Sequence, residues 1–139
     1  MSAAREQRAS LRVLVAEDNR VNQMLVSRLL ERVGHAVVLA ETGQDAVAAH
    51  ARQKFDVILM DVQMPEMNGF EATAAIRAAE GASSEGTPIV AMTAHAMKGD
   101  RERCLAGGMD GYVSKPIDPA ILFDVIEHVL ASRMTPTLV

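Results

Sequence analysis

The side chains best suited to chemistry in this sequence stand where short apolar runs end. Glu17 and Asp18 follow the run RVLVA, and Asp61 follows DVILM. Thr93 follows PIVAM, and Lys115 follows GYVS. A carboxylate hidden without a partner is strongly destabilising, so three acids in such places call for an explanation.

Three carboxylates gathered at one place repel one another and need a cation or a proton to coexist. All their ligand atoms are oxygen, with no His or Cys in the same pattern, which favours a hard ion such as Mg²⁺ over Zn²⁺. Taken singly, each acid is also explained as a solvated turn residue or helix cap. Thr93 alone is explained as a strand former, and Lys115 alone as a surface lysine. Three acids, a hydroxyl and an ammonium group in one pattern favour a shared site.

The elements that must position these residues are short and alternate along the chain. Five apolar runs are typical of strands: RVLVA (12–16), HAVVLA (35–40), DVILM (56–60), PIVAM (88–92) and GYVS (111–114). This alternation of strands and helical patterns predicts an α/β fold, a doubly wound parallel sheet with helices on both faces. The polar residues would then lie at the carboxyl edge of the sheet, where such folds bind ligands.

Helical patterns fill the segments between these runs. The first helix is indicated by Val21, Met24, Leu25 and Leu29 at helix spacing, with a stop at Gly34. Thr42 with Asp45 and Asn68 with Glu71 indicate the starts of the second and third helices. The segment 98–106 is expected to form a short fourth helix, and Asp118 before Pro119 marks the start of the last one. The last helix carries an apolar stripe of Ile121, Leu122, Val125, Ile126, Val129 and Leu130.

Composition excludes several function classes. The chain has 139 residues, 49% of them hydrophobic and 23% charged, which suits one packed domain. We expect that domain at 11–133, with tails at 1–10 and 134–139. A net charge of −4, the lack of a Lys/Arg run and 3% aromatic residues argue against nucleic-acid binding. The single cysteine, Cys104, excludes a disulfide framework within the chain.

The polar start of the chain is not a signal peptide, and no apolar run is long enough to span a membrane. We therefore expect a soluble, cytoplasmic segment with no direct membrane insertion.

The remaining residues that could bear chemistry have simpler explanations. The four histidines are scattered without metal-ligand spacing and are interpreted as solvated: His35, His50, His95 and His128. Met64, Met67 and Cys104 are interpreted as packing residues. Tyr112, the only tyrosine, is explained by packing at a strand edge.

Four blocks of the sequence resemble the receiver domains of response regulators. They are VLVAEDNRVNQ, FDVILMDVQMPEMNGFEATAAIR, PIVAMTAHAM and GGMDGYVSKPI. The resemblance runs from about Leu11 to Arg133. The amino-acid sequence of the four blocks is most similar to that of receivers attached to hybrid sensor histidine kinases. It implies a flavodoxin-like fold with strand order 2-1-3-4-5.

The resemblance also implies a role for each candidate residue. Asp61 is the phosphoacceptor, and Asp18, Asp61 and the backbone carbonyl of Gln63 bind Mg²⁺, with Mn²⁺ as a substitute. Glu17 acts on the metal mainly through water. Lys115 and Thr93 contact the phosphoryl group, and the peptide bond between Lys115 and Pro116 is cis. Tyr112 is the rotameric partner of Thr93. Gln63 and His95 occupy positions that tune the lifetime of the phosphoryl group.

A receiver implies defined partners and a defined surface for its output. The phosphodonor is a histidine kinase, and a histidine-phosphotransfer domain is an acceptor. Output is expected at the fourth helix, fifth strand and fifth helix. Such a domain catalyses its own phosphoryl transfer and dephosphorylation. We expect the segment to come from a hybrid sensor histidine kinase, with a stand-alone response regulator as the alternative. Stimulus, cognate kinase and oligomeric state stay open.

Rival functions lack residues that they need. A haloacid-type phosphatase requires an acid two residues after its nucleophile, where this chain has Gln63. A flavin module would have to place a phosphate beside Glu17 and Asp18, which would repel it. An ATP-dependent kinase needs a phosphate-binding motif such as G-x-x-x-x-G-K-[ST], which the sequence lacks. A receiver scaffold that has lost phosphorylation would lack site residues, and none is missing.

Overall fold

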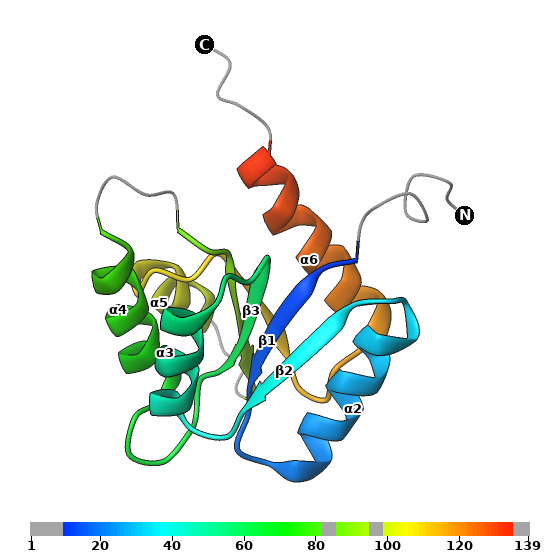
Figure 1. Cartoon of the computed structure of the whole chain (residues 1–139), viewed down its shortest axis with the longest axis horizontal. Helices are drawn as coiled ribbons and strands as arrows, with labels where there is room; N and C mark the ends of the chain where they lie inside the picture. The colour runs from blue at the N-terminus through cyan, green and yellow to red at the C-terminus, as the bar shows by residue number, and fades with distance from the viewer. Residues whose placement is uncertain (1–9, 82–85, 95–98, 135–139) are drawn as a thin grey trace.

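The structure is a computed structural model that describes residues 10–81, 86–94 and 99–134. Five strands alternate with five helices in these residues (Figure 1). In chain order they are β1 (Arg12–Ala16), α2 (Arg20–Arg32), β2 (Ala36–Ala40), α3 (Gly43–Arg52), β3 (Val57–Asp61), α4 (Gly69–Glu80), β4 (Ile89–Thr93), α5 (Asp100–Ala106), β5 (Gly111–Ser114) and α6 (Pro119–Met134). His95 lies outside the described residues.

All strand pairs are parallel, and the sheet order is β2-β1-β3-β4-β5. Helices α2 and α6 cover one face of the sheet, and α3, α4 and α5 cover the other (Figure 1). The doubly wound, flavodoxin-like fold with this strand order is therefore confirmed. Because the strands are parallel, their carboxyl ends share one edge, at the bottom of the sheet in Figure 1.

The hydrophobic core has two layers, one on each face of the sheet. One cluster joins the sheet to α3, α4 and α5, and the other joins it to α2 and α6. The central strands β3 and β4 are buried along their whole length, which explains their unbroken apolar runs. Each of these strands nevertheless ends on a buried polar residue, Asp61 and Thr93.

The predicted helix starts are confirmed by their caps. The Thr42 hydroxyl accepts a hydrogen bond from the Asp45 N–H at 3.0 Å, and Asn68 forms a capping box with Glu71. The Asp118 carboxylate accepts a bond from the Ala120 N–H at 2.9 Å. These bonds satisfy N–H groups that the first turn of a helix leaves without partners.

The predicted apolar stripe of α2 is not its buried face. Val21, Met24 and Leu25 are exposed, and only Leu29 packs against the core. The buried residues of this helix are Gln23, Val26 and Leu30. Gln23 can occupy the buried face because its side chain has a buried backbone partner there, the Glu17 carbonyl. The stripe of α6 is confirmed except for Ile121, which is exposed.

Two of the histidines predicted to be solvated are half-buried and bonded. His35 Nδ1 accepts a hydrogen bond from the Leu11 N–H at 3.1 Å, which requires the neutral ring. Burial lowers the pKa of His35, with the charge of Asp56 acting against it. His50 Nε2 lies 3.0 Å from a Glu80 carboxylate oxygen. His128 is exposed, as predicted.

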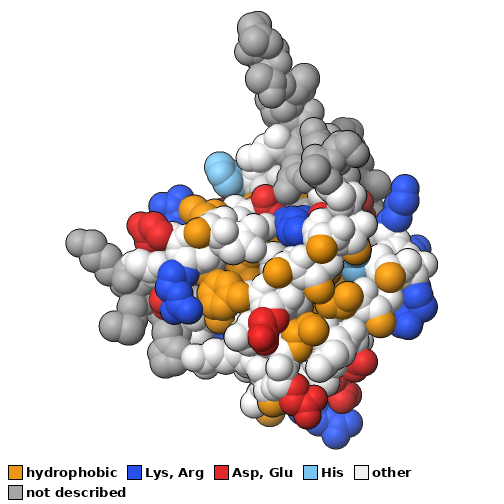
Figure 2. All heavy atoms as spheres, turned by 90° about the vertical axis from the view of Figure 1, so that its left-hand side faces the viewer, with side chains coloured by type: hydrophobic (Ala, Val, Ile, Leu, Met, Phe, Trp, Pro, Cys, Tyr) orange, Lys and Arg blue, Asp and Glu red, His pale blue; other side chains and the backbone are white. Residues whose placement is uncertain are grey.

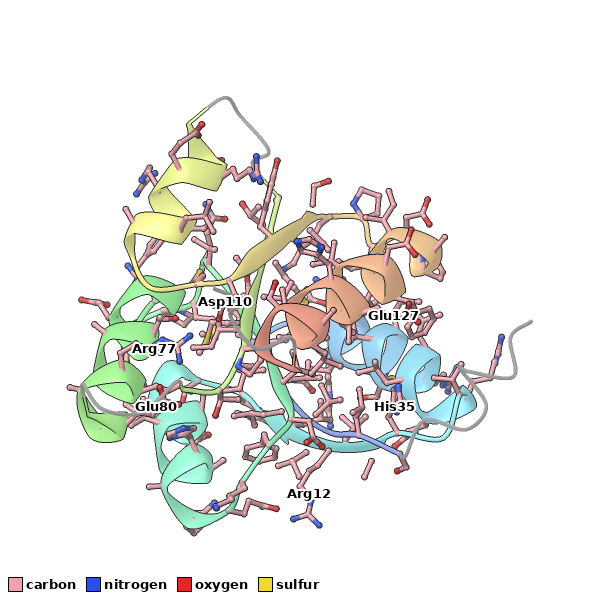
Figure 3. The ribbon with its side chains drawn as sticks, turned by 90° about the horizontal axis from the view of Figure 1, so that it is seen from above. Arg12, His35, Arg77, Glu80, Asp110 and Glu127 are labelled. Carbon is pink, nitrogen blue, oxygen red and sulfur yellow. The ribbon has the colours of Figure 1, made fainter. Side chains whose placement is uncertain are left out.

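Arg77 ties α4 to the starts of β4 and β5. Its guanidinium donates to the Gly108 carbonyl at 2.9 and 3.0 Å and to Asp110 Oδ2 at 2.9 Å. It also donates to the Thr87 carbonyl at 2.8 Å and to Glu80 at 2.7 Å. Figure 3 shows this side chain reaching from α4 toward Asp110. The network holds the amino ends of the strands whose other ends carry Thr93 and Lys115.

Most of the large exposed hydrophobic side chains of the helices lie on the face covered by α2 and α6, and Leu105 on α5 is the exception among those described. Among the described residues, those of the helices are Val21, Met24, Leu25, Leu105 and Ile121, three of them on α2. The face over α3, α4 and α5 instead shows hydrophobic atoms dispersed among charges of both signs (Figure 2). Within the described residues, none of the helices combines the length and apolar character needed to cross a membrane.

Candidate functional site

Three carboxylates meet at the carboxyl edge of the sheet. Glu17 and Asp18 follow β1, and Asp61 is the last residue of the adjacent strand β3. One oxygen from each acid lies within 4.8 Å of the others. Glu17 and Asp61 are 0% and 3% exposed, whereas Asp18 is exposed. The predicted convergence of these acids is therefore present.

Lys115 brings a positive charge to this cluster from the loop after β5. Its Nζ lies 2.9 Å from Glu17 Oε1 and 3.3 Å from Asp61 Oδ1. The Lys115 N–H donates to the Thr93 carbonyl at 2.8 Å, which fixes the backbone below the ammonium group. The Lys115–Pro116 peptide is cis, as expected.

Glu17 and Asp61 each also accept a backbone hydrogen bond. The Asn19 N–H donates to Glu17 Oε2 at 3.1 Å, and the Gln63 N–H donates to Asp61 Oδ1 at 3.1 Å. These bonds orient both carboxylates from the two loops that leave β1 and β3.

Asp61 is the acid most affected by this environment. Burial, followed by the charge of Glu17, raises the pKa of Asp61 to about 7, while Lys115 and the Gln63 N–H act against the rise. Burial works to lower the pKa of Lys115, but its hydrogen bond to Glu17 and the charges of Asp61 and Glu17 outweigh burial and raise it. The cluster thus holds more negative charge than one lysine offsets.

That excess charge and the donor set fit a hard divalent cation. All the acid ligands are oxygen atoms, and one of the three acids is open to solvent, which suits an ion that keeps part of its water shell. A magnesium-sized ion at this edge would relieve the repulsion that raises the pKa of Asp61.

Thr93 and Tyr112 lie on the neighbouring strands. Met92 pairs with Asp61 in the sheet, so Thr93 extends one residue beyond Asp61 at the same edge, and it is buried. Tyr112 pairs with Ala91, farther from the edge, and packs half-buried against the core cluster beneath α5. The side chain of Gln63 is exposed.

The sequence reasoning missed two residues that support the acids, Asn19 and Gln23. Asn19 caps α2 through the Asn22 N–H and also donates to Glu17. The Gln23 side chain donates to the Glu17 carbonyl at 2.6 Å. Gln23, Val26 and Leu30 stand at helix spacing, so a polar residue in phase with two buried ones was an available signal.

Comparison with known families explains why these acids, a hydroxyl and a lysine meet at the carboxyl edge of the sheet. Residues 13–127 match the model of the response regulator receiver domain. This chain belongs to the response regulator receiver family. The match covers all the acids, Thr93 and Lys115, so the predicted resemblance is confirmed.

Curated relatives of this receiver are much longer proteins. It is 48% identical over 120 residues to hybrid signal transduction histidine kinase I of Dictyostelium discoideum, covering 83% of this chain and 7% of that protein. It is also 48% identical over 116 residues to the sensor protein GacS of Pseudomonas syringae pv. syringae, covering 83% of this chain and 13% of that protein. The receiver thus spans about a tenth of the relatives it matches.

Solved structures include receivers with a metal or a partner bound. One is the receiver domain of a sensor histidine kinase from Pseudomonas aeruginosa PAO1 with magnesium in its active-site cleft (TM-score 0.77, 39% identity, 88% of this chain and 99% of that one). Another is a Saccharomyces cerevisiae response regulator receiver bound to a histidine phosphotransfer protein (TM-score 0.80, 28% identity, 91% and 92% covered).

Proposed function

We propose that this receiver accepts a phosphoryl group from a phosphohistidine donor onto Asp61 and passes it on or changes conformation. The observation that carries the proposal is Lys115, whose ammonium group contacts both Glu17 and Asp61. This places a fixed positive charge beside a buried carboxylate, which is the arrangement needed to bring a phosphoryl group to an acid nucleophile.

In this mechanism Asp61 attacks as a carboxylate. One oxygen forms a bond to phosphorus as the bond from phosphorus to the donor's histidine nitrogen breaks, and that electron pair stays on the imidazole. Lys115 offsets charge on the phosphoryl oxygens, and the Thr93 hydroxyl donates to one of them. The Gln63 N–H holds the carboxylate in place for in-line attack.

A divalent cation would be held by Asp18, Asp61 and the Gln63 carbonyl, with Glu17 acting through water. Mg²⁺ fits this donor set, and Mn²⁺ is its expected substitute. When bound, the ion supplies neutralisation of the charge that develops on the phosphoryl oxygens. The acid cluster and the magnesium-bound relative from Pseudomonas aeruginosa support this assignment.

The output surface is proposed on α5, β5 and α6. A new acyl phosphate offers the Thr93 hydroxyl an acceptor, and Tyr112, half-buried beside α5, would change rotamer with that shift. A groove of about 420 Å³ lies on this surface, with Tyr112, Leu105 and His128 among its lining residues. Gln63 and His95 are proposed to tune the lifetime of the phosphoryl group.

The donor is proposed to dock on an apolar patch at the rim of the site, formed by Val21, Met24, Leu25 and Ile121. These residues are 72%, 50%, 42% and 52% exposed and lie on α2 and α6. The two helices lie side by side on one face of the sheet, and both begin at the edge that carries Asp61 (Figures 1 and 3). A histidine kinase or a histidine-phosphotransfer domain could cover this patch with an apolar helix face.

The chain is proposed to be a receiver segment, residues 11–133, of a hybrid sensor histidine kinase. The two hybrid and sensor kinases at 48% identity support this origin. A stand-alone response regulator is the second candidate. Because histidine kinases make phosphohistidine from ATP, we place the domain in the cytoplasm.

Incubation with acetyl phosphate and Mg²⁺, followed by intact-mass measurement, tests the proposed function. The wild-type chain should gain one phosphoryl mass, Asp61→Asn should gain none, and Asp124→Asn, an exposed acid on α6, should behave as wild type. Phosphorylation of the Asp61→Asn chain at another residue would overturn the assignment.

A further inference from the structure

Gln23 is a polar residue on the buried face of α2. It is 6% exposed and shares that face with Val26 and Leu30. A buried amide loses its hydrogen bonds to water and needs a partner within the protein. An apolar residue would fill this position without such a requirement, so the partner of Gln23 indicates what it does.

That partner is the backbone at the site. Gln23 Nε2 donates to the Glu17 carbonyl oxygen at 2.6 Å. Ala16 is the last residue of β1 that pairs with both neighbouring strands, so this carbonyl lies where the chain leaves the sheet. The Glu17 N–H is held on its other side by the Ala40 carbonyl at 3.0 Å. Gln23 therefore sets the orientation of the peptide that joins Glu17 to Asp18.

The orientation of this peptide decides where Asp18 points. The Glu17 carboxylate is held independently by Lys115 at 2.9 Å and by the Asn19 N–H at 3.1 Å. Asp18 is exposed, and its carboxylate oxygen still lies within 4.8 Å of ligand oxygens from Glu17 and Asp61. A rotation of the joining peptide would move Asp18 relative to the other two acids.

We propose that Gln23 is a positioning residue for the cation site, acting through the Glu17 carbonyl on the place of Asp18. The inference rests on the proposed function, because it concerns the same acids. Mg²⁺ requires near-octahedral coordination at short distances, whereas Ca²⁺ accepts longer and more variable ones. Loss of the Gln23 hydrogen bond should therefore weaken Mg²⁺ binding more than Ca²⁺ binding.

Calorimetric titration of the metal-free chain with MgCl2 and, separately, with CaCl2 tests this role. Gln23→Met keeps the length of the side chain and removes the donor. We expect its Mg²⁺ affinity to fall by about tenfold, as is typical when a group that orients a metal ligand is removed, and its Ca²⁺ affinity by less than about twofold. Val26→Ala, on the same buried face, is the control and should lower thermal stability with both affinities within about twofold of wild type.

Three results would overturn the inference. The first is a Mg²⁺ affinity of Gln23→Met within twofold of wild type. The second is an equal loss of Mg²⁺ and Ca²⁺ affinity, which would indicate that the substitution loosens the structure in general. If the wild-type chain bound no Mg²⁺, the proposed cation site would fail together with the role of Gln23. Should Gln23→Met not fold, Gln23→Asn, whose amide is one methylene too short to reach the carbonyl, takes its place under the same criteria.

Discussion

The Nζ atom of Lys115 lies 3.3 Å from Oδ1 of Asp61, although β4 separates the strands that lead to these two residues. The contact exists because Lys115 is anchored to the end of β4 through its N–H bond to Thr93 and extends across that strand. Lys115 lies closer to Glu17, at 2.9 Å, and is thus shared between two buried carboxylates. Burial and the charge of Glu17 outweigh this shared lysine, so the pKa of Asp61 is raised despite the ion pair.

Asp61→Asn should stabilise the metal-free protein at pH 8. The folded-state pKa of Asp61 is raised from 3.8 to about 7, so the folded state gains stability from the protonated acid at low pH. That contribution is lost as the pH rises through about 7, because ionisation is then easier in the unfolded chain. The variant escapes this loss and should gain about 1–3 kcal/mol at pH 8.

Urea unfolding in EDTA at pH 5 and pH 8 measures this difference. The advantage of Asp61→Asn should be smaller at pH 5 than at pH 8, because the cost of ionising Asp61 accumulates between the unfolded-state pKa of 3.8 and the folded-state pKa of about 7. An equal effect at both pH values, or a loss of stability at pH 8, would show that the ion pair with Lys115 outweighs burial.

Lys115→Ala should separate metal binding from phosphoryl uptake. The three acids are unchanged and have lost a competing cation, so Mg²⁺ affinity should be kept or increased. Uptake from acetyl phosphate should fall by at least about tenfold, because no ammonium group remains beside Asp61.

Calorimetry and intact-mass kinetics provide the two measurements for Lys115→Ala. Lys54→Ala, at an exposed lysine after α3, should match wild type in both. Normal uptake by Lys115→Ala would remove Lys115 from the mechanism.

Met24→Lys should slow transfer from a protein donor and leave transfer from acetyl phosphate unchanged. Met24 is half-exposed on the apolar patch and does not form part of the acid cluster. A charge there would have to be desolvated when an apolar partner docks, so transfer should slow by about tenfold or more.

The control for docking is Val33→Lys, the same change at the other end of α2, where Val33 is equally exposed. Phosphorylated histidine kinases or phosphotransfer domains serve as donors, and rates are compared for all three chains. Equal slowing by both substitutions would place docking elsewhere on the molecule.

Gly69→Ala should be more destabilising than Gly111→Ala. A Cβ at Gly69 would clash with the Asp61 carbonyl and lie 2.9 Å from Val62 Cα, both of them backbone atoms. A Cβ at Gly111 would meet only side-chain methyl groups of Val125 and Val129, at 3.1 and 3.2 Å. Flexible side chains move more readily than the backbone at the end of a buried strand.

Thermal unfolding should show a loss of about 1–3 kcal/mol for Gly69→Ala and less than about 1 kcal/mol for Gly111→Ala. Uptake by Asp61 should fall only in the Gly69 variant, because its clash is with the peptide of Asp61 itself. A reversed order of stability would show that the start of α4 adapts more easily than β5.

Most of the fold could be predicted from local sequence patterns. The strand boundaries agree with the apolar runs to within one residue, because parallel strands buried on both faces need unbroken apolar runs. The helix starts at Thr42, Asn68 and Asp118 agree because these capping bonds join residues two or three positions apart. The network of Arg77, by contrast, joins residues up to 33 positions apart and has no local pattern.

By itself, the sequence determined the alternation of strands and helices and the acids, hydroxyl and lysine that stand at the strand ends, because these depend on residue type and short spacing. Tertiary structure alone decided that Lys115 is shared by Glu17 and Asp61, and that α2 buries Gln23 while exposing Met24. Both outcomes depend on distances between segments far apart in the chain, and on whether a buried polar group finds a partner there.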